Sequence, residues 1–110
     1  MNAECFQIDR RDNVATLLQD ATEDTEVLVR GDTQATSLQC RALIRAGHKI
    51  AVCDIREGDH ILKYGQPIGV ATSAIARGEW VHLHNCRSLY DAKSSSLDLE
   101  SGERKETRYA

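Results

Sequence analysis

Apolar and polar positions alternate along much of this chain. From residue 26 onward apolar side chains recur at every second position, in the segments 26–30, 49–52, 60–64 and 80–84. A period of two puts successive side chains on opposite faces of an extended chain, so each segment is predicted to be a short strand. The stretch 33–43 has no clear period and is compatible with helix, strand or loop.

The N-terminal part predicts the one helix we expect. Phe6 and Ile8 indicate a short strand. Asp12 or Asn13 can then cap a turn or two of helix, because their side chains accept hydrogen bonds from the first amides of a helix. The apolar positions of this short helix are Val14, Leu17 and Leu18.

A short internal repeat supports a β architecture. The pattern Ile-x-x-Gly-x-x-Ile/Val occurs over 44–50, 55–61 and 75–81, at offsets of 11 and 20 positions. Each unit combines an apolar anchor, a glycine turn and the start of a strand, since glycine tolerates the positive φ of tight turns. Units this short are predicted to be successive corners of one small β domain.

The composition limits the size and core of this domain. A chain of 110 residues has room for a single small domain, and 41% hydrophobic with 28% charged residues is typical of globular chains. Aromatic residues make up only 5%, which predicts an aliphatic core. After Tyr90 the sequence becomes polar, with two leucines among Ser, Asp, Glu, Lys and Arg. We therefore expect a domain over 1–90 and a flexible tail over 91–110.

Charge and hydropathy argue against two classes of partner. The net charge is −3 with both signs interspersed, so no surface for nucleic acid is expected. The longest mostly apolar stretch, 68–76, is far shorter than the roughly 20 residues of a membrane span, so no membrane partner is expected. The N-terminal residues lack the features of a signal peptide, which predicts a cytoplasmic protein.

The cysteines carry little chemical signal. Cys5, Cys40, Cys53 and Cys86 form no C-x-x-C pair, so they are interpreted as free thiols that pack as small hydrophobes. Phosphate-binding glycine loops, nucleophile elbows and zinc-protease motifs are absent as well. The chain therefore offers no complete catalytic apparatus of its own.

The sharpest chemical feature is the segment 80–85, Trp-Val-His-Leu-His-Asn. On a strand, His82 and His84 would stand on one face while Val81 and Leu83 turn towards the core. Two neighbouring imidazoles can share a divalent metal or hold an anionic substrate. The alternative is a plain solvated face.

Two further corners carry candidate side chains. Gly47-His48-Lys49 adds a histidine and a cation beside a turn, and Lys63-Tyr64 precedes a second turn with Pro67. A lysine and a phenol can neutralise and orient a carboxylate. Both corners could equally be ordinary solvated surface, and His60 is expected to be structural or solvated.

Four of these segments occur in an order and spacing that resembles a known family. They are Gly47-His48-Lys49-Ile50-Ala51, Asp54-Ile55, Lys63-Tyr64-Gly65-x-Pro67-Ile68-Gly69-x-Ala71-Thr72 and Gly78-Glu79-Trp80-Val81-His82-x-His84-Asn85. Together they resemble the SAF domain of the UxaA family of dehydratases, which includes altronate and galactarate dehydratases and the two-subunit sulfolactate sulfo-lyase. The resemblance covers about residues 8 to 86. It implies a mainly β, SAF-type β-clip fold, to which the helix predicted near the N-terminus is added.

The resemblance also implies a function. It is α,β-elimination from a sugar acid or similar hydroxy acid, assisted by a divalent metal such as Fe²⁺. Because the chain ends soon after the matching region, we expect a small subunit that works with a separate large UxaA-type subunit and is inactive alone. SAF-like domains also occur as non-catalytic binding modules for small acids, carbohydrates or proteins, and this alternative stays open.

The residues that match the family's motifs become the candidate site. The resemblance implies catalytic roles for His48, His82 and His84, with His82 and His84 also as metal ligands. It implies that the substrate is bound by Lys49, Lys63, Tyr64 and Asn85. Cys86 and His60 do not match the family pattern and are left out of this prediction.

Overall fold

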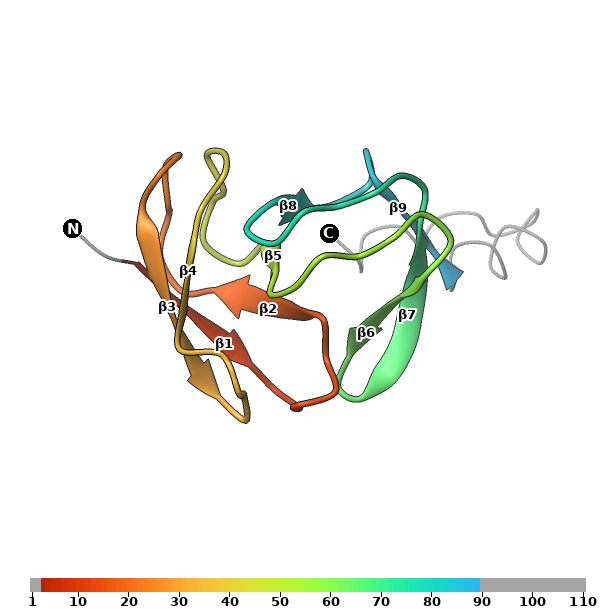
Figure 1. The fold of residues 1–110 in the computed structure, drawn as a ribbon, viewed down its shortest axis with the longest axis horizontal. Coiled ribbons are helices and arrows are strands. Elements are labelled where there is room, and N and C mark those ends of the chain that lie inside the picture. Colours follow the sequence, from red (N-terminus) through yellow and green to blue (C-terminus); the bar gives the residue numbers. More distant parts are fainter. Residues whose placement is uncertain (1–2, 90–110) are drawn as a thin grey trace, which may run out of the picture.

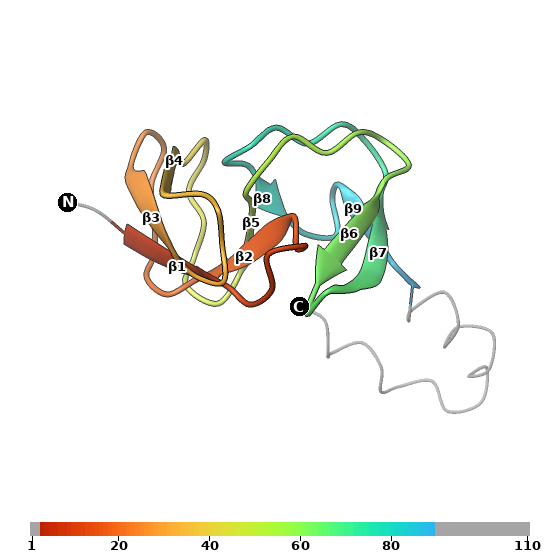
Figure 2. The same cartoon turned by 60° about the horizontal axis from the view of Figure 1, so that its bottom comes forward.

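The computed structural model describes residues 3–89, and this part of the chain is mainly β (Figure 1). A six-stranded sheet has the order β4-β3-β1-β2-β5-β8 and a three-stranded sheet the order β6-β7-β9. The strands are β1 (Ala3–Gln7), β2 (Val14–Leu17), β3 (Glu26–Gly31), β4 (Ser37–Gln39), β5 (Lys49–Ala51), β6 (His60–Lys63), β7 (Gln66–Ala71), β8 (Trp80–Val81) and β9 (Cys86–Ser88). Figures 1 and 2 both show β5 and β8 between the first four strands and the smaller sheet.

The predicted mainly β fold is confirmed, but the predicted N-terminal helix is wrong. Its residues form β2, which pairs antiparallel with β1 on one side and with β5 on the other. Val14, Ala15 and Leu17 are all buried, because the core covers both faces of this strand. Burial on both faces removes the period of two, so the sequence alone suggested a helix. The ambiguous stretch 33–43 contains β4.

The internal repeat is confirmed as three structurally similar corners. The first residues of the units, Ile44, Ile55 and Ile75, are each at most 2% exposed. The three glycines, at positions 47, 58 and 78, have φ of 89°, 89° and 91°. Ile55 and Ile75 form an isolated antiparallel bridge with each other, and Ile44 forms such a bridge with Ala21.

A fourth unit escaped the sequence analysis. Residues 21–27 follow the same path, with buried Ala21 and Val27 at the ends and Asp24 at the glycine position. Asp24 has φ of 73°, a left-handed conformation that Asp tolerates better than most residues. The four units thus form two bridged pairs, 21–27 with 44–50 and 55–61 with 75–81.

Capping hydrogen bonds repeat within the two pairs. Asp20 Oδ1 accepts a hydrogen bond of 2.8 Å from the Ala46 amide, and Asp54 Oδ1 accepts one of 2.9 Å from the Arg77 amide. In each pair the aspartate before the first unit therefore caps the turn of the second unit. This local chemistry fixes the corners from which the site residues project.

The core is aliphatic, as the composition predicted, and has two clusters. One packs mainly between β1, β2, β3 and β5, and the other between β2, β5, β6, β7 and β8. Cys5 and Cys40 are buried in the first cluster, and burial raises the pKa of the Cys5 thiol to about 12. Cys53 is exposed, so its interpretation as a core residue is wrong: the chain has left β5 at this point. Among the described residues no helix is long and apolar enough to span a membrane.

Two polar residues tie the smaller sheet to the larger one. Asn13 Oδ1 accepts a hydrogen bond of 2.7 Å from the Leu62 amide, and its Nδ2 donates one of 2.9 Å to the His60 carbonyl. The side-chain amide of Asn13 thus pairs with the backbone of β6, as a neighbouring strand would. The neighbouring Asp12 binds the turn after β6. The predicted tail 91–110 and Tyr90 lie outside the described residues.

Candidate functional site

The segment 80–85 turns instead of continuing as a strand. β8 ends at Val81, and the side chain of Asn85, only 5% exposed, closes the turn that follows. Its Oδ1 accepts a hydrogen bond of 3.0 Å from the His82 amide, and its Nδ2 donates one of 2.9 Å to the Trp80 carbonyl. Val81 is buried as predicted. The prediction that Leu83 faces the core is wrong, since Leu83 is 65% exposed at this turn.

The turn nevertheless gathers the predicted histidines around one indole ring. The Trp80 ring stacks on His82, with centroids 5.0 Å apart and an interplanar angle of 11°, and contacts His84 at 4.9 Å. His48 comes from the corner 44–50, and its ring centroid lies 5.6 Å from that of Trp80 and 5.3 Å from that of His82. We call these four side chains the histidine cluster.

Trp80 also fixes the chemistry of one imidazole. Its Nε1 donates a hydrogen bond of 3.3 Å to Nδ1 of His48, which makes Nδ1 the acceptor and assigns the proton of a neutral ring to Nε2. The sequence analysis did not include Trp80 among the site residues. Its position directly before the His-x-His motif is the signal that could have found it.

Lys49 lies beside the histidine cluster. Its strand β5 pairs with β8, with Lys49 opposite Val81. Burial lowers the pKa of Lys49, and the positive charge of Lys63 lowers it further. The side chain lines a small pocket of about 20 Å³ together with Ile68, His82, Leu83, Cys86 and Ser88.

Two other groups of this pocket have perturbed acidity. The pKa of His82 is lowered by partial burial and by the nearby charges of His48, Lys49 and His84. Burial raises the pKa of the Cys86 thiol, while Lys49 opposes this shift. Cys86 was left out of the predicted site, although it follows His84 by two residues. The structure places it in the same pocket as Lys49 and His82.

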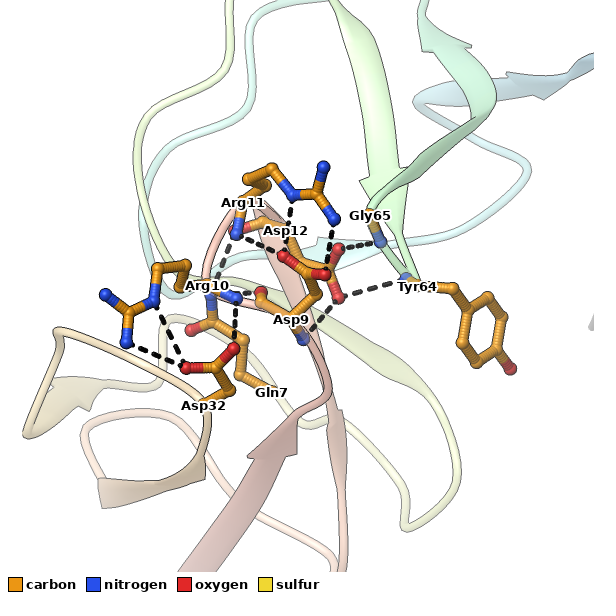
Figure 3. Close-up of polar contacts among 8 residues, drawn as sticks. All are labelled: Gln7, Asp9, Arg10, Arg11, Asp12, Asp32, Tyr64 and Gly65. Carbon is orange, nitrogen blue, oxygen red and sulfur yellow. Dashed lines mark hydrogen bonds and ion pairs between the residues drawn. The ribbon is translucent and has the colours of Figure 1, made fainter.

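The second corner contributes Lys63 and Tyr64 at the end of β6. Tyr64 and Gly65 form a turn with φ of 62° and 70°, and the Asp12 carboxylate accepts hydrogen bonds from both amides (Figure 3). Lys63 Nζ lies 5.0 Å from the centroid of the Tyr64 ring. Figure 3 shows this ring pointing away from the carboxylate, and Tyr64 is 58% exposed. The charge of Lys63 acts on Lys49, whose pKa it lowers. No contact joins the Tyr64 ring to the histidine cluster within the described residues.

Lysine and histidine side chains gather in this region, and the carboxylate of Glu79 lies in the cavity that Trp80 and His84 line. Within residues 3–89, no acidic side chain forms an ion pair with a lysine or histidine of the candidate site, namely His48, Lys49, Lys63, His82 and His84. Cations without acidic partners favour an anionic ligand. The imidazoles can also accept or donate a proton near neutral pH.

The same histidines include the two predicted metal ligands, His82 and His84. Over residues 3–89, no group of three or more His, Cys, Asp or Glu side chains is arranged to hold a metal ion. His82 lies flat against Trp80, and His48 uses Nδ1 as the acceptor for the indole. The described residues therefore do not form a metal site by themselves.

Fold and site together define a small β module that gathers lysine and imidazole side chains around one turn. A family model described as the altronate/galactarate dehydratase SAF domain matches residues 3–89. The chain belongs to this family, as its motifs suggested.

Known relatives show where such a module occurs. Over 83 residues the chain is 46% identical to an altronate dehydratase of Escherichia coli, a match that spans 76% of this chain and 16% of that enzyme. It is 29% identical to the (2R)-sulfolactate sulfo-lyase subunit alpha of Chromohalobacter salexigens over 73% of this chain and 88% of that subunit. The corresponding subunit of Paracoccus pantotrophus is 34% identical over 56% of this chain and 91% of that subunit. The chain thus spans about one sixth of the dehydratase and nearly all of the alpha subunits.

Proposed function

We propose that this chain is the small subunit of a lyase and works with a separate large catalytic subunit of the dehydratase type. The complex catalyses α,β-elimination from a sugar acid or similar hydroxy acid. The observation that carries this proposal is the cluster of imidazoles and lysines around the turn 80–85, without acidic partners in the described residues. The match to nearly the whole length of two sulfo-lyase alpha subunits supports the two-chain arrangement.

The elimination needs two kinds of group that this site contains. A proton donor must protonate a hydroxyl that leaves the next carbon as water (sulfite leaves as an anion), and a base must remove the proton on the carbon beside the carboxylate. A neutral imidazole can take up this proton, and the lowered pKa of His82 keeps its ring neutral near neutral pH. We assign proton transfer to His48, His82 and His84.

Negative charge builds up on the substrate when the proton leaves. Lys49 and Lys63 stabilise this charge and bind the carboxylate, because cations held in a partly buried site act strongly on developing charge. Tyr64 stays only a predicted substrate ligand, because no contact joins its exposed ring to the histidine cluster among the described residues. Asn85 contributes by holding the turn, since both ends of its amide already bind the backbone.

The divalent metal, expected as Fe²⁺, belongs in this proposal to the large subunit. A bound metal would act as a Lewis acid on the substrate. His82 and His84 could add a ligand to such a site only in the complex, and none of the steps assigned above depends on it.

Co-purification of a large chain with this protein tests the proposal. A tagged chain is purified from its native host, the co-purifying proteins are identified by mass spectrometry, and the complex is analysed for metal. Recovery of a dehydratase-like large chain with a divalent metal supports the lyase. A metal-free protein without such a chain would contradict it and favour a binding module.

Substitutions then test the site. Replacing His82 and His84 by Ala should abolish turnover in the reconstituted complex while the subunit keeps its fold and its partner. His60→Ala is the matched control, because His60 is exposed at the start of β6, outside the cluster. Full activity of the His82 and His84 variants would refute the assignment.

A further inference from the structure

A second cavity borders the turn 80–85 and takes no part in the steps assigned above. It measures about 320 Å³ and is lined among others by Arg41, Ser73, Glu79, Trp80 and His84. None of its lining residues belongs to the small pocket around Lys49, although the turn 80–85 contributes to both. Its volume lies at the lower end of the range of small-molecule sites, roughly 300 to 1,000 Å³.

The position of Arg41 in this cavity is fixed by the fold. Its Nε donates a hydrogen bond of 3.0 Å to the Arg77 carbonyl, and its backbone amide donates one of 3.0 Å to the Gly78 carbonyl. A Cβ at Gly78 would overlap the Gln39 carbonyl and lie 3.3 Å from Arg41 Cγ, so the loop packs closely on this glycine. The terminal amino groups of the guanidinium have no acceptor among the described residues and remain available for a ligand.

Glu79 supplies the complementary group. Its Oε1 accepts a hydrogen bond of 3.2 Å from the Ala76 amide, which anchors the carboxylate and leaves Oε2 as an acceptor. No ion pair joins Arg41 and Glu79, although both line the cavity. Arg41 and Glu79 thus line one cavity without pairing with each other, and Arg41 also borders a larger cavity of about 390 Å³ that Glu23 and Asp24 line.

The remaining wall is aromatic or small. Trp80 and His84 contribute rings, while Ser73 and its neighbour Ala74 leave room beside them. Aromatic faces pack against carbon-bound hydrogens, and alternating donors and acceptors match hydroxyl groups. A flexible chain that carries several hydroxyls and a carboxylate has this combination of groups.

We propose that this cavity binds the polyhydroxylated end of a sugar acid, with Arg41 and Glu79 as the residues that select it. This inference rests on the proposed function, because it extends the substrate away from the lysines and the histidine cluster. A three-carbon hydroxy acid has no such end and gains nothing from the cavity. Arg41 and Glu79 therefore favour longer polyhydroxy acids.

The indole Nε1–H of Trp80 provides the readout, because Trp80 is the sole tryptophan of the chain and lines the cavity. The full chain, labelled with ¹⁵N, is titrated with the six-carbon acid galactarate and with lactate at equal ionic strength. We expect a saturable shift of the indole resonance with galactarate and none with lactate. Arg41→Gln should weaken the galactarate affinity by about tenfold or more.

One control variant and one further test variant keep the experiment specific. Arg45→Gln removes an exposed arginine of another corner, which pairs with Asp20 at 3.6 Å, and should leave the affinity unchanged. Glu79→Gln keeps the acceptor for the Ala76 amide and should weaken binding without loss of the fold. Equal shifts with both acids, equal affinities of the two arginine variants, or no saturable shift would each overturn the proposal.

Turnover and partner binding distinguish a failure of the cavity assignment from a failure of the proposed function. If the Arg41→Gln complex turns over six-carbon acids as well as the unmodified complex while the His82 and His84 variants are inactive, the cavity has no role and the lyase assignment stands. If no large chain associates, the lyase assignment fails, and a saturable galactarate shift still reports on the cavity.

Discussion

Removal of the Asp12 carboxylate should destabilise the domain far more than removal of a surface carboxylate. Asp12 is only 5% exposed and accepts hydrogen bonds from the amides of Asp9 at 3.2 Å, Tyr64 at 3.1 Å and Gly65 at 2.7 Å. These bonds connect the loop between β1 and β2 to the turn between β6 and β7 (Figure 3). Tyr64 has a positive φ, which is unfavourable for a bulky residue, so the turn depends on this carboxylate.

The expected cost follows from the lost partners. A hydrogen bond to a charged group contributes about 1.5–3 kcal/mol, and a buried donor left without an acceptor costs about 1–3 kcal/mol. Since three partly buried amides share one carboxylate and their contributions are not additive, Asp12→Ala should lower the free energy of unfolding by about 4 kcal/mol. With a urea m value of about 1.5 kcal/mol/M, the midpoint shifts down by roughly 2.5 M.

Asp32→Ala is the matched comparison. Asp32 also accepts from an amide and a guanidinium, both of Arg10, but its side chain is 47% exposed and that of Arg10 is 63% exposed. Exposed pairs of this kind contribute about 1 kcal/mol or less. Urea unfolding followed by circular dichroism measures both variants. Equal losses of stability in the two variants would refute the argument that burial and the shared amides give Asp12 its effect.

Two other predictions address the corners and the histidine cluster. Gly47→Ala should lower the free energy of unfolding by only about 1 kcal/mol, because φ is 89° but no atom lies within 4 Å of the added Cβ. Gly78→Ala should lower it by roughly 3–4 kcal/mol, because its φ is 91° and its Cβ would also overlap the Gln39 carbonyl. Equal urea midpoints of the two variants would contradict this. The pKa of His82 is lowered in the folded chain. Between this lowered pKa and the ordinary value of about 6.5, the unfolded chain therefore binds more protons than the folded chain. Stability is lost as the pH falls through that window. Fluorescence of the stacked Trp80 should follow this protonation, and a midpoint at or above the ordinary value would contradict the burial argument.

The local pattern along the chain was sufficient for much of the fold. Alternation identified β3, β5 and β6, and the repeat of Ile and Gly located three of the four corners, because both depend on each residue's own conformational preferences and on burial of one face. It failed at β2, where neighbouring strands and the core cover both faces and remove the alternation. The fourth corner was missed because Asp24 occupies a glycine position there.

The sequence by itself determined the fold class, the family and which side chains could do chemistry. Only the tertiary structure decided how these side chains meet: Asn85 closes a turn that ends β8 early, and pairing of β5 with β8 brings the 47–49 corner beside it. As a result His48 and His82 gather on Trp80, whereas the Tyr64 ring points elsewhere. The physical reason is that spacing along a chain fixes direction only within one element, while contacts between elements depend on long-range pairing and on buried hydrogen bonds.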